Sequence, residues 1–290
     1  MKSGVLGVFI VCGAACVWTI PARAKDGSAV FGELRKQMNC EHVAAKDECI
    51  EFTRGGFVRG LDRESERRFV LARTITESDN RAGTERVRVD FISGPHRGAR
   101  YAKELDFPQA TSRENAVVPE VDPQRIIRVA MSPLAQVLGT RLPFIFLHLY
   151  GYLNGYAWDL NDATGSTQLV LMGRPKSSTL FLLPHVELRL DQRGPAYTVD
   201  QMWLFAQRGA HRADMYKFSF EKYKKLGARD IYRPMEVEIT LYFGRRTEVD
   251  RLRFDEWLFR IDPSPSEKRA LFQLNSALSI PQDSKLLTIR

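Results

Sequence analysis

The five histidines are the residues of this sequence best suited to metal or acid-base chemistry, and their spacing supports neither. His42, His96, His148, His185 and His211 are scattered, and none lies at metal-ligand spacing from a second histidine or from a cysteine. His148 and His185 lie among apolar residues, where we expect a neutral imidazole bonded to a carbonyl oxygen. The histidines therefore predict no metal centre.

Other segments carry residues of the right type for chemistry at the wrong spacing. Residues 54–60 (RGGFVRG) lack the Lys-Ser/Thr pair of a phosphate-binding loop, and no nucleophile elbow of the form Gly-x-Ser-x-Gly occurs. Residues 159–165 (DLNDATG) resemble half of a calcium loop, but Ala163 and Thr164 stand where a third ligand and a glycine are required. We therefore predict no catalytic residue and no cofactor, and a protein that is not an enzyme.

The first 24 residues have the layout of a secretory signal. An apolar run extends from Val5 to Ile20, and the small residues of Ala22-Arg23-Ala24 suit a signal peptidase. We predict cleavage after Ala24 and export to the periplasm or cell envelope. An uncleaved N-terminal anchor is the alternative, because the run is long for a signal.

The charge of the chain points to weak contacts with anionic surfaces. The net charge of +8 falls to +6 once Lys2 and Arg23 are removed with the signal, and the remaining charges are interspersed. This balance favours peripheral contact with lipid headgroups. An exported chain of modest charge is not expected to bind nucleic acid.

Two cysteines, Cys40 and Cys49, remain after the signal is removed. In an oxidising compartment they are candidates for a disulfide, which would stabilise the fold by about 2–3 kcal/mol. An unbroken helix through both residues would hold them too far apart to bridge. Two buried thiols are the alternative.

Most of the chain has the alternation typical of strands. In residues 84–94, apolar Val87, Val89 and Phe91 alternate with charged residues, which indicates one buried and one wet sheet face. Similar runs fill residues 48–107 and 167–262, separated by Gly- and Pro-containing turns. We predict a single domain, residues 25–290, built on one large antiparallel sheet that curls.

A helical insert at about 122–155 separates the two blocks of strands. Asp122 is a plausible N-cap before Pro123, and apolar residues follow at helical spacing. The insert ends in an apolar stretch whose core, Leu142–Leu153, is 12 residues long and too short to span a membrane. That stretch is either a core helix or the lid of a cavity.

The order of elements resembles the LolA/LppX-like superfamily of periplasmic lipoprotein carriers and lipid-binding proteins, in its uncharacterised exported branch. The resemblance lies in Phe220–Asp255, in the closing segment Leu271–Arg290, and loosely in the hairpin residues 97–101. It implies a mainly β, α+β fold: an incomplete barrel of curved antiparallel sheet, covered by an N-terminal helix and by the insert. We find no match for the arginine that the family uses near its cavity mouth.

Two functions follow as hypotheses. By analogy with the family, the protein binds or carries a lipid or an acylated protein in a hydrophobic cavity. The alternative is a structural or protein-interaction module of the envelope with a filled core. The large aromatic residues expected to line such a cavity are Phe144, Phe146, Tyr150, Trp203 and Phe205.

Overall fold

The computed structural model describes residues 26–38, 49–60, 66–78, 82–94, 97–107, 111–118, 126–128, 149–161, 168–176, 185–208, 210–227, 229–280 and 286–289. The predicted signal, Cys40, Phe144 and Phe146 lie outside these residues. No helix among the described residues is long and apolar enough to cross a membrane.

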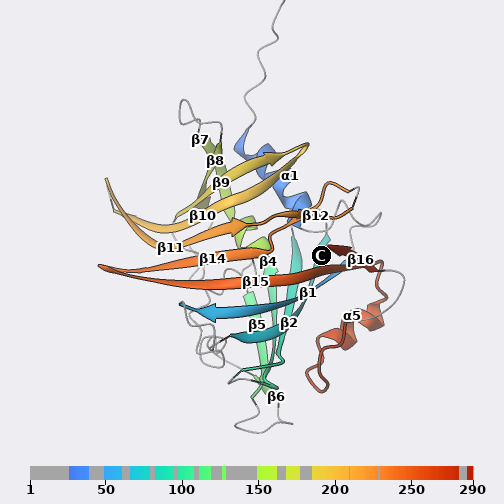
Figure 1. Ribbon diagram of the computed structural model, residues 1–290. Coiled ribbons are helices and arrows are strands. Elements are labelled where there is room, and N and C mark those ends of the chain that lie inside the picture. Colours follow the sequence, from blue (N-terminus) through green and yellow to red (C-terminus); the bar gives the residue numbers. More distant parts are fainter. Residues whose placement is uncertain are drawn as a thin grey trace, which may run out of the picture.

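The described residues form one 14-stranded antiparallel sheet and a small second sheet (Figure 1). In spatial order the large sheet contains β6 (Ile126–Arg128), β5 (Thr111–Val117), β4 (Arg100–Phe107), β3 (Ala82–Phe91), β2 (Arg67–Ser78), β1 (Cys49–Arg59), β15 (Arg246–Ile261), β14 (Glu236–Phe243), β11 (His211–Glu221), β10 (Ala196–Arg208), β9 (His185–Arg193), β8 (Leu169–Pro175) and β7 (Tyr156–Asn161). Strand β16 (Leu286–Ile289) pairs with β15, and β12 (Lys224–Lys225) pairs with β13 (Tyr232–Arg233).

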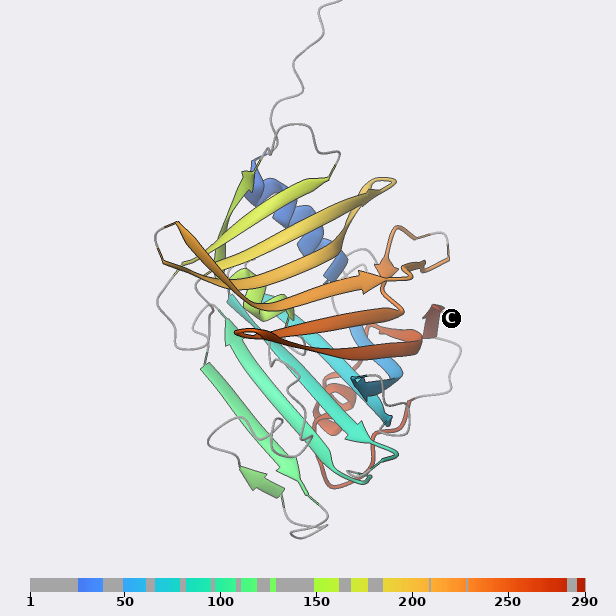
Figure 2. The same ribbon diagram turned by 60° about the vertical axis from the view of Figure 1, so that its left-hand side comes forward.

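The large sheet consists of two meanders joined by one long-range pairing. Strands β1 to β6 form one meander, and β7 to β11 with β14 and β15 form the other. Cys49 of β1 lies opposite Ile261 of β15. Edge strands β6 and β7 do not pair with each other, so the curved sheet stays open (Figure 2). This confirms the predicted mainly β fold with an incomplete barrel.

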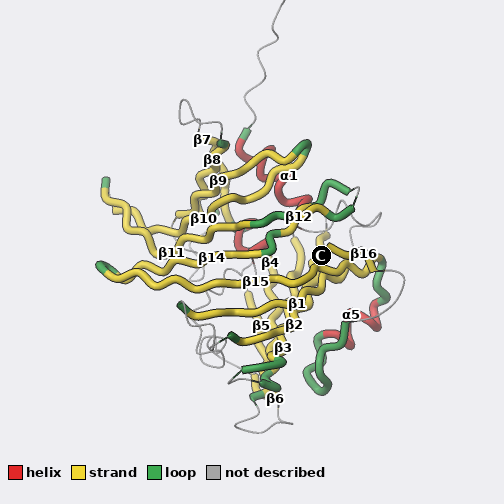
Figure 3. The backbone as a smooth tube through the Cα atoms, in the orientation of Figure 1, coloured by secondary structure: helices red, strands yellow, loops and turns green. Residues whose placement is uncertain are grey.

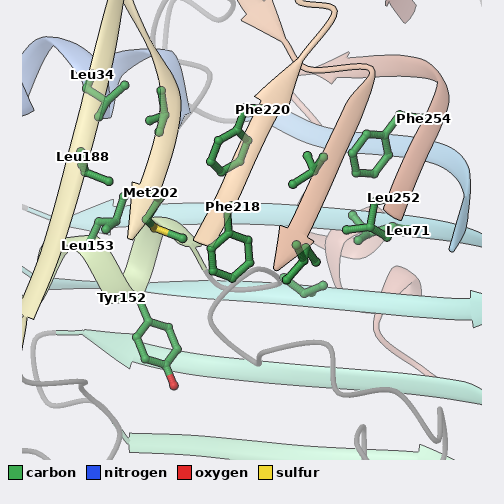
Figure 4. Packing of buried hydrophobic residues seen from close by; sticks show 14 of the residues in the cluster. Leu34, Leu71, Tyr152, Leu153, Leu188, Met202, Phe218, Phe220, Leu252 and Phe254 are labelled. Carbon is green, nitrogen blue, oxygen red and sulfur yellow. The ribbon is translucent and has the colours of Figure 1, made fainter. Parts of the chain in front are cut away.

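Alternating side chains give the sheet two different faces. In β14, Val237, Ile239 and Leu241 are buried, while the side chains between them point the other way. We call the face that the helices α1 and α4 cover the inner face, and the opposite one the outer face. Apolar side chains from both meanders meet on the inner face in one core (Figure 4).

Helix α1 (Gly27–Met38) covers part of the inner face, as the resemblance implied. Its buried residues Val30, Phe31 and Leu34 pack into the core, and the Phe31 ring stacks on Trp158 with centroids 4.8 Å apart. A Cβ on Gly27 would lie 2.6 Å from the backbone nitrogen of Leu160. Only glycine therefore allows the helix to approach β7 this closely.

The prediction of a helical insert at about 122–155 is wrong near the start of that range, whereas the end of the range is helical. Residues Ile126–Arg128 form strand β6, which pairs with Asn115–Val117 at the sheet edge. Two adjacent β-branched isoleucines favour extended backbone, and pairing with β5 outweighs the helical spacing. Helix α4 (Leu149–Asn154) contacts β3, β4 and β7, and residues 129–148 lie outside the described chain (Figure 3).

The C-terminal segment covers the outer face of the first meander. Helix α5 (Pro265–Leu271) begins at a capping box in which Ser264 and Glu267 each bond the other's backbone. The helix and the residues after it pack on a small apolar cluster centred on Phe52 and Leu258. We call residues 262–280 the strap.

Arg88 of β3 fastens the strap to the sheet. Its side chain is 1 % exposed, forms a two-pronged ion pair with Asp90, and donates to the carbonyl oxygens of Leu271 and Gln273, both at 2.8 Å. Asp90 in turn accepts a hydrogen bond from the backbone nitrogen of Leu278 at 2.6 Å. One buried ion pair thus satisfies the backbone of a segment that has no sheet partners of its own.

Arg88→Met is expected to lower the free energy of unfolding by about 3–5 kcal/mol, because Asp90 is left buried without its partner. Arg251→Met, which breaks an exposed pair with Glu238, is the matched control and is expected to cost at most about 1 kcal/mol. Urea unfolding of both variants measures the difference. Equal losses would show that the pair does not hold the strap.

Candidate functional site

A cavity of about 110 Å³ lies between the C-terminal half of α1 and the inner face of the sheet. Apolar side chains make up most of its wall, among them Leu34 of α1, Leu71 of β2, Val199 of β10, Phe220 of β11 and Trp257 of β15. Figure 4 labels three of them, Leu34, Leu71 and Phe220, among the buried apolar side chains. The wall is therefore built from strands of both meanders and from one helix.

The volume is small for a ligand site. Pockets that hold small molecules usually measure about 300–1,000 Å³. With α1 in place, the cavity has room for only a few carbon atoms of a chain. A larger apolar ligand would extend out of the cavity or displace α1 from the sheet.

One end of the cavity is polar and charged. Glu51 of β1 lies between two guanidinium groups, with its Oε2 at 2.8 Å from Arg73 Nη2 and 3.0 Å from Arg233 Nη2. Burial alone would raise the pKa of Glu51, but the two arginines outweigh it and hold the pKa below its ordinary value. Glu51 is therefore ionised at neutral pH although it is fully buried.

The same two arginines hold the end of α1. Arg73 Nη2 donates to the carbonyl oxygen of Met38 at 3.0 Å, and Arg233 Nη1 donates to that of Gln37 at 2.8 Å. The last carbonyls of a helix have no partner within the helix, and cations stabilise this end. We call Glu51, Arg73 and Arg233 the latch, because they join the sheet to its cover.

The latch continues into a row of alternating charges across the inner face. Glu51, Arg73, Glu85, Lys103 and Glu114 lie on the consecutive strands β1 to β5, and Glu51 with Arg73 and Lys103 with Glu114 are register partners. Arg73 Nη1 lies 3.8 Å from Glu85 Oε1, and Lys103 is paired with Glu114. Burial lowers the pKa of Lys103 to about 8, although its contact with Glu114 acts in the opposite direction. We call these five residues the charge ladder.

The charge ladder also holds the second helix. Glu85 Oε2 accepts a hydrogen bond from the backbone nitrogen of Gly151 in α4 at 2.8 Å. A Cβ on Gly151 would lie 2.7 Å from the Leu105 side chain, so glycine permits this close approach. Both helices on the inner face are thus bonded to buried charges of the sheet.

Of the aromatic residues expected to line a cavity, the three that the structure describes do not line this one. Tyr150 of α4 is fully buried against Ile75. Trp203 and Phe205 lie on the outer face of β10, where Phe205 stacks on His185 with ring centroids 5.3 Å apart. Phe144 and Phe146 lie outside the described residues.

A β-bulge explains the position of Trp203 and Phe205. Tyr197 and Val199 face inward, and unbroken alternation would carry that face on to Trp203 and Phe205. The pairing of β10 with β9 shifts by one residue between Val199 and Gln201, so that the inner positions beyond it are Met202 and Leu204.

Within the part of the chain that the structure describes, no group of three or more His, Cys, Asp or Glu residues is placed to hold a metal ion. Asp159 and Asn161 of the calcium-like segment belong to strand β7, and the rest of that segment lies outside the described residues.

Comparisons with known proteins reveal structural relatives only. No family model and no curated protein matches the sequence. A domain from Vibrio parahaemolyticus named for outer membrane lipoprotein sorting matches with a TM-score of 0.59 and 13 % identity, over 84 % of this chain and 100 % of that one. A DUF1329 family protein from Desulfovibrio piger matches with a TM-score of 0.58 and 11 % identity, over 86 % of this chain and 100 % of that one.

A LolA superfamily protein from Nitrosomonas europaea is similar as well, with a TM-score of 0.57 and 12 % identity over 86 % of this chain and 98 % of that one. At these identities the likeness concerns the fold alone. The chain has a LolA/LppX-like fold, as the resemblance in its sequence indicated.

The latch predicts a specific acid sensitivity. Because the pKa of folded Glu51 lies below its ordinary value of 4.5, its ionisation stabilises the fold above that pH, and the contribution is lost as the pH falls toward the folded-state pKa. Glu51→Gln should cost about 3–5 kcal/mol at neutral pH and flatten the pH dependence of unfolding between about pH 5 and 3. Urea titrations across this range test it, with Glu238→Gln on the surface as control. A Glu51→Gln profile as steep as that of the wild type would contradict the assignment.

Cys49 is disulfide-bonded at the first position of β1, and its predicted partner Cys40 lies outside the described residues. We predict that a peptide map of the protein, prepared under oxidising conditions and without reductant, contains a Cys40–Cys49 crosslink, and that Cys49→Ser lowers the free energy of unfolding by about 2–3 kcal/mol. Alkylation of Cys40 before reduction would refute this pairing.

Proposed function

We propose that the protein is an exported, non-catalytic binding module that holds an acyl chain of a lipid or of an acylated protein between α1 and the inner face of the sheet. The observation that carries the proposal is the mainly apolar cavity under the end of α1, closed by a polar latch. The similar domain from Vibrio parahaemolyticus, named for lipoprotein sorting, supports the same class of ligand.

Binding would be passive and driven by apolar burial. Each methylene group that leaves water contributes about 0.8 kcal/mol, so a chain of ten carbons gains several kcal/mol. Val30, Phe31 and Leu34 of α1 occupy part of the inner face in the closed form, and the ligand takes over these contacts as the helix lifts.

The latch suits a cover that opens and closes again. Apolar contacts between α1 and the sheet have no preferred register, whereas the bonds from Arg73 and Arg233 to Met38 and Gln37 fix one closed position. Because Glu51 stays on the sheet and keeps both arginines paired, opening leaves neither guanidinium without its carboxylate. It releases the carbonyls of Gln37 and Met38 and breaks the bond from Gln37 Nε2 to the carbonyl oxygen of Asp230. Breaking the polar contacts of α1 therefore adds little to the free-energy cost of lifting the helix.

The site of action follows from the first 24 residues and from the fold. The apolar run and the small residues before Lys25 direct export in this proposal, and acyl chains are abundant at the membranes of the envelope. The proposal also includes peripheral contact between the basic surface of the protein and lipid headgroups.

A structural or protein-interaction module is the second candidate. The observation that favours it is the size of the cavity: at about 110 Å³ the inner face is nearly filled by its own side chains. In that case α1 would be a fixed part of the core rather than a movable cover.

Uptake of a fluorescent fatty acyl probe by the mature protein, together with native mass spectrometry of the purified chain, separates the two candidates. Val199→Phe fills the cavity and is expected to weaken uptake at least about tenfold, at a cost in stability of about 1–3 kcal/mol. Val249→Phe, on the outer face opposite Thr240, is the matched control and should bind like the wild type. A wild-type protein that carries no lipid and takes up no probe would leave the structural module as the function.

A further inference from the structure

Two aromatic rings stack on the outer face of the second meander, at the ends of the strands that point away from the latch. Trp203 of β10 and Tyr242 of β14 meet across β11, with ring centroids 6.1 Å apart and planes 19° apart. Both side chains are partly exposed. The wet face of an antiparallel sheet is usually polar, and aromatic residues gathered on a surface are typical of contact sites. These rings therefore indicate a partner for this face.

Three cations lie over the indole ring of Trp203. Lys217 Nζ is 5.1 Å from the ring centroid, Arg212 Cζ is at 5.4 Å and Arg189 Cζ is at 5.9 Å. The two arginines share the carboxylate of Glu187, whereas Lys217 pairs with no carboxylate among the residues that the structure describes. We call the following five residues the outer patch: Arg189, Trp203, Arg212, Lys217 and Tyr242.

The tip of the β14–β15 hairpin adds two more cations beside Tyr242. Arg245 and Arg246 are both exposed, and neither pairs with a carboxylate within the described chain. The hairpin projects at the left of Figure 1, on the far side of the sheet from α5. The five cations of the patch and the tip are accompanied by three carboxylates: Glu187, Asp214 and Glu248. Positive charge is therefore in excess at this end of the sheet.

This combination of rings and cations fits the headgroup layer of an anionic membrane. Trp and Tyr side chains are enriched where headgroups meet acyl chains, because each ring has an apolar body and a polar edge. Cation–π contacts at exposed sites are weak, so the cations over Trp203 can exchange the ring for lipid phosphates. The cations are spread over two strands and a turn, and a surface with many phosphates meets more of them at once than a single anion does.

We infer that the outer patch and the tip of the β14–β15 hairpin dock the protein on a membrane that contains anionic phospholipids. The inference rests on the proposed function and deepens it, because it assigns the headgroup contact to particular residues. Arg245 and Arg246 meet the phosphates, and the rings of Trp203 and Tyr242 enter the headgroup layer. Helix α1 is held by the latch at the other ends of the same strands, so docking leaves the helix free to move.

Cosedimentation of the mature protein with vesicles tests the docking. One set of vesicles contains equal parts of phosphatidylglycerol and phosphatidylcholine, and the other contains phosphatidylcholine alone. We expect the affinity for the anionic vesicles to be at least about tenfold higher, since each basic residue near an anionic surface contributes about fivefold. Binding should weaken as salt is added, because salt screens contacts between exposed charges.

The double variant Arg245→Glu with Arg246→Glu should lower the affinity for the anionic vesicles at least about tenfold. The matched control is Arg97→Glu with Arg113→Glu. It reverses two exposed arginines of the first meander that also lack a carboxylate partner among the described residues. Both double variants change the net charge equally, so the control should bind within about twofold of the wild type.

Trp203 supplies a second readout, which a general attraction between charges would not change. Trp158 and Trp257 are only 4 % and 7 % exposed. Phosphatidylglycerol with brominated acyl chains should therefore quench mainly Trp203, the partly exposed tryptophan. Quenching in the wild type should be lost in Trp203→Phe, which keeps an aromatic ring at this position.

The outcomes separate the docking surface from acyl binding. Equal binding by the two double variants, or lipid quenching that persists in Trp203→Phe, would overturn the docking surface. A wild-type protein that ignores anionic vesicles would overturn it too, and an acidic protein would then be the partner of this face. Uptake of the acyl probe without vesicles tests the proposed function by itself, and Arg245→Glu with Arg246→Glu should leave that uptake unchanged.

Discussion

The shared carboxylate of Glu51 is the contact on which the inner face depends. It lies in the strand that joins the two meanders, and it keeps Arg73 of β2 and Arg233 of β13 buried side by side. Without it, two guanidinium groups would face each other in a site of low dielectric, which is strongly unfavourable. With it, each arginine has donors left for the last carbonyls of α1. The attachment of the end of α1 to the sheet therefore depends on this one carboxylate.

The two covers of the sheet are attached by the same chemistry on opposite faces. On the inner face, arginines donate to the carbonyls of α1, and on the outer face Arg88 and Arg100 donate to the carbonyls of the strap. The covers differ in what lies beneath them: a cavity under α1, and a packed apolar cluster under the strap. Guanidinium groups suit this role because their several donors reach more than one backbone carbonyl at once.

Much of the fold was predictable from the sequence, and much of the site was not. Alternation of apolar and polar residues identified the strands, because one buried sheet face imposes a period of two. Alternation does not show where a β-bulge reverses the faces of a strand, and such a bulge lies between Val199 and Gln201. The charge ladder left a signal that was missed: Glu85 is in phase with Val87 and Val89, and Lys103 with Tyr101. A charge in phase with buried residues indicates a buried ion pair. The partner strand that neutralises it is set by the register, which the sequence alone does not reveal.

The pairing of β1 with β15 has a consequence for how the chain is made. Residues about two hundred positions apart must meet before the centre of the sheet exists, and contacts of such long range form slowly. The first meander alone would present β1 as an open edge, and the latch would lack Arg233. The centre of the sheet therefore cannot form until residues 246–261 have been synthesised.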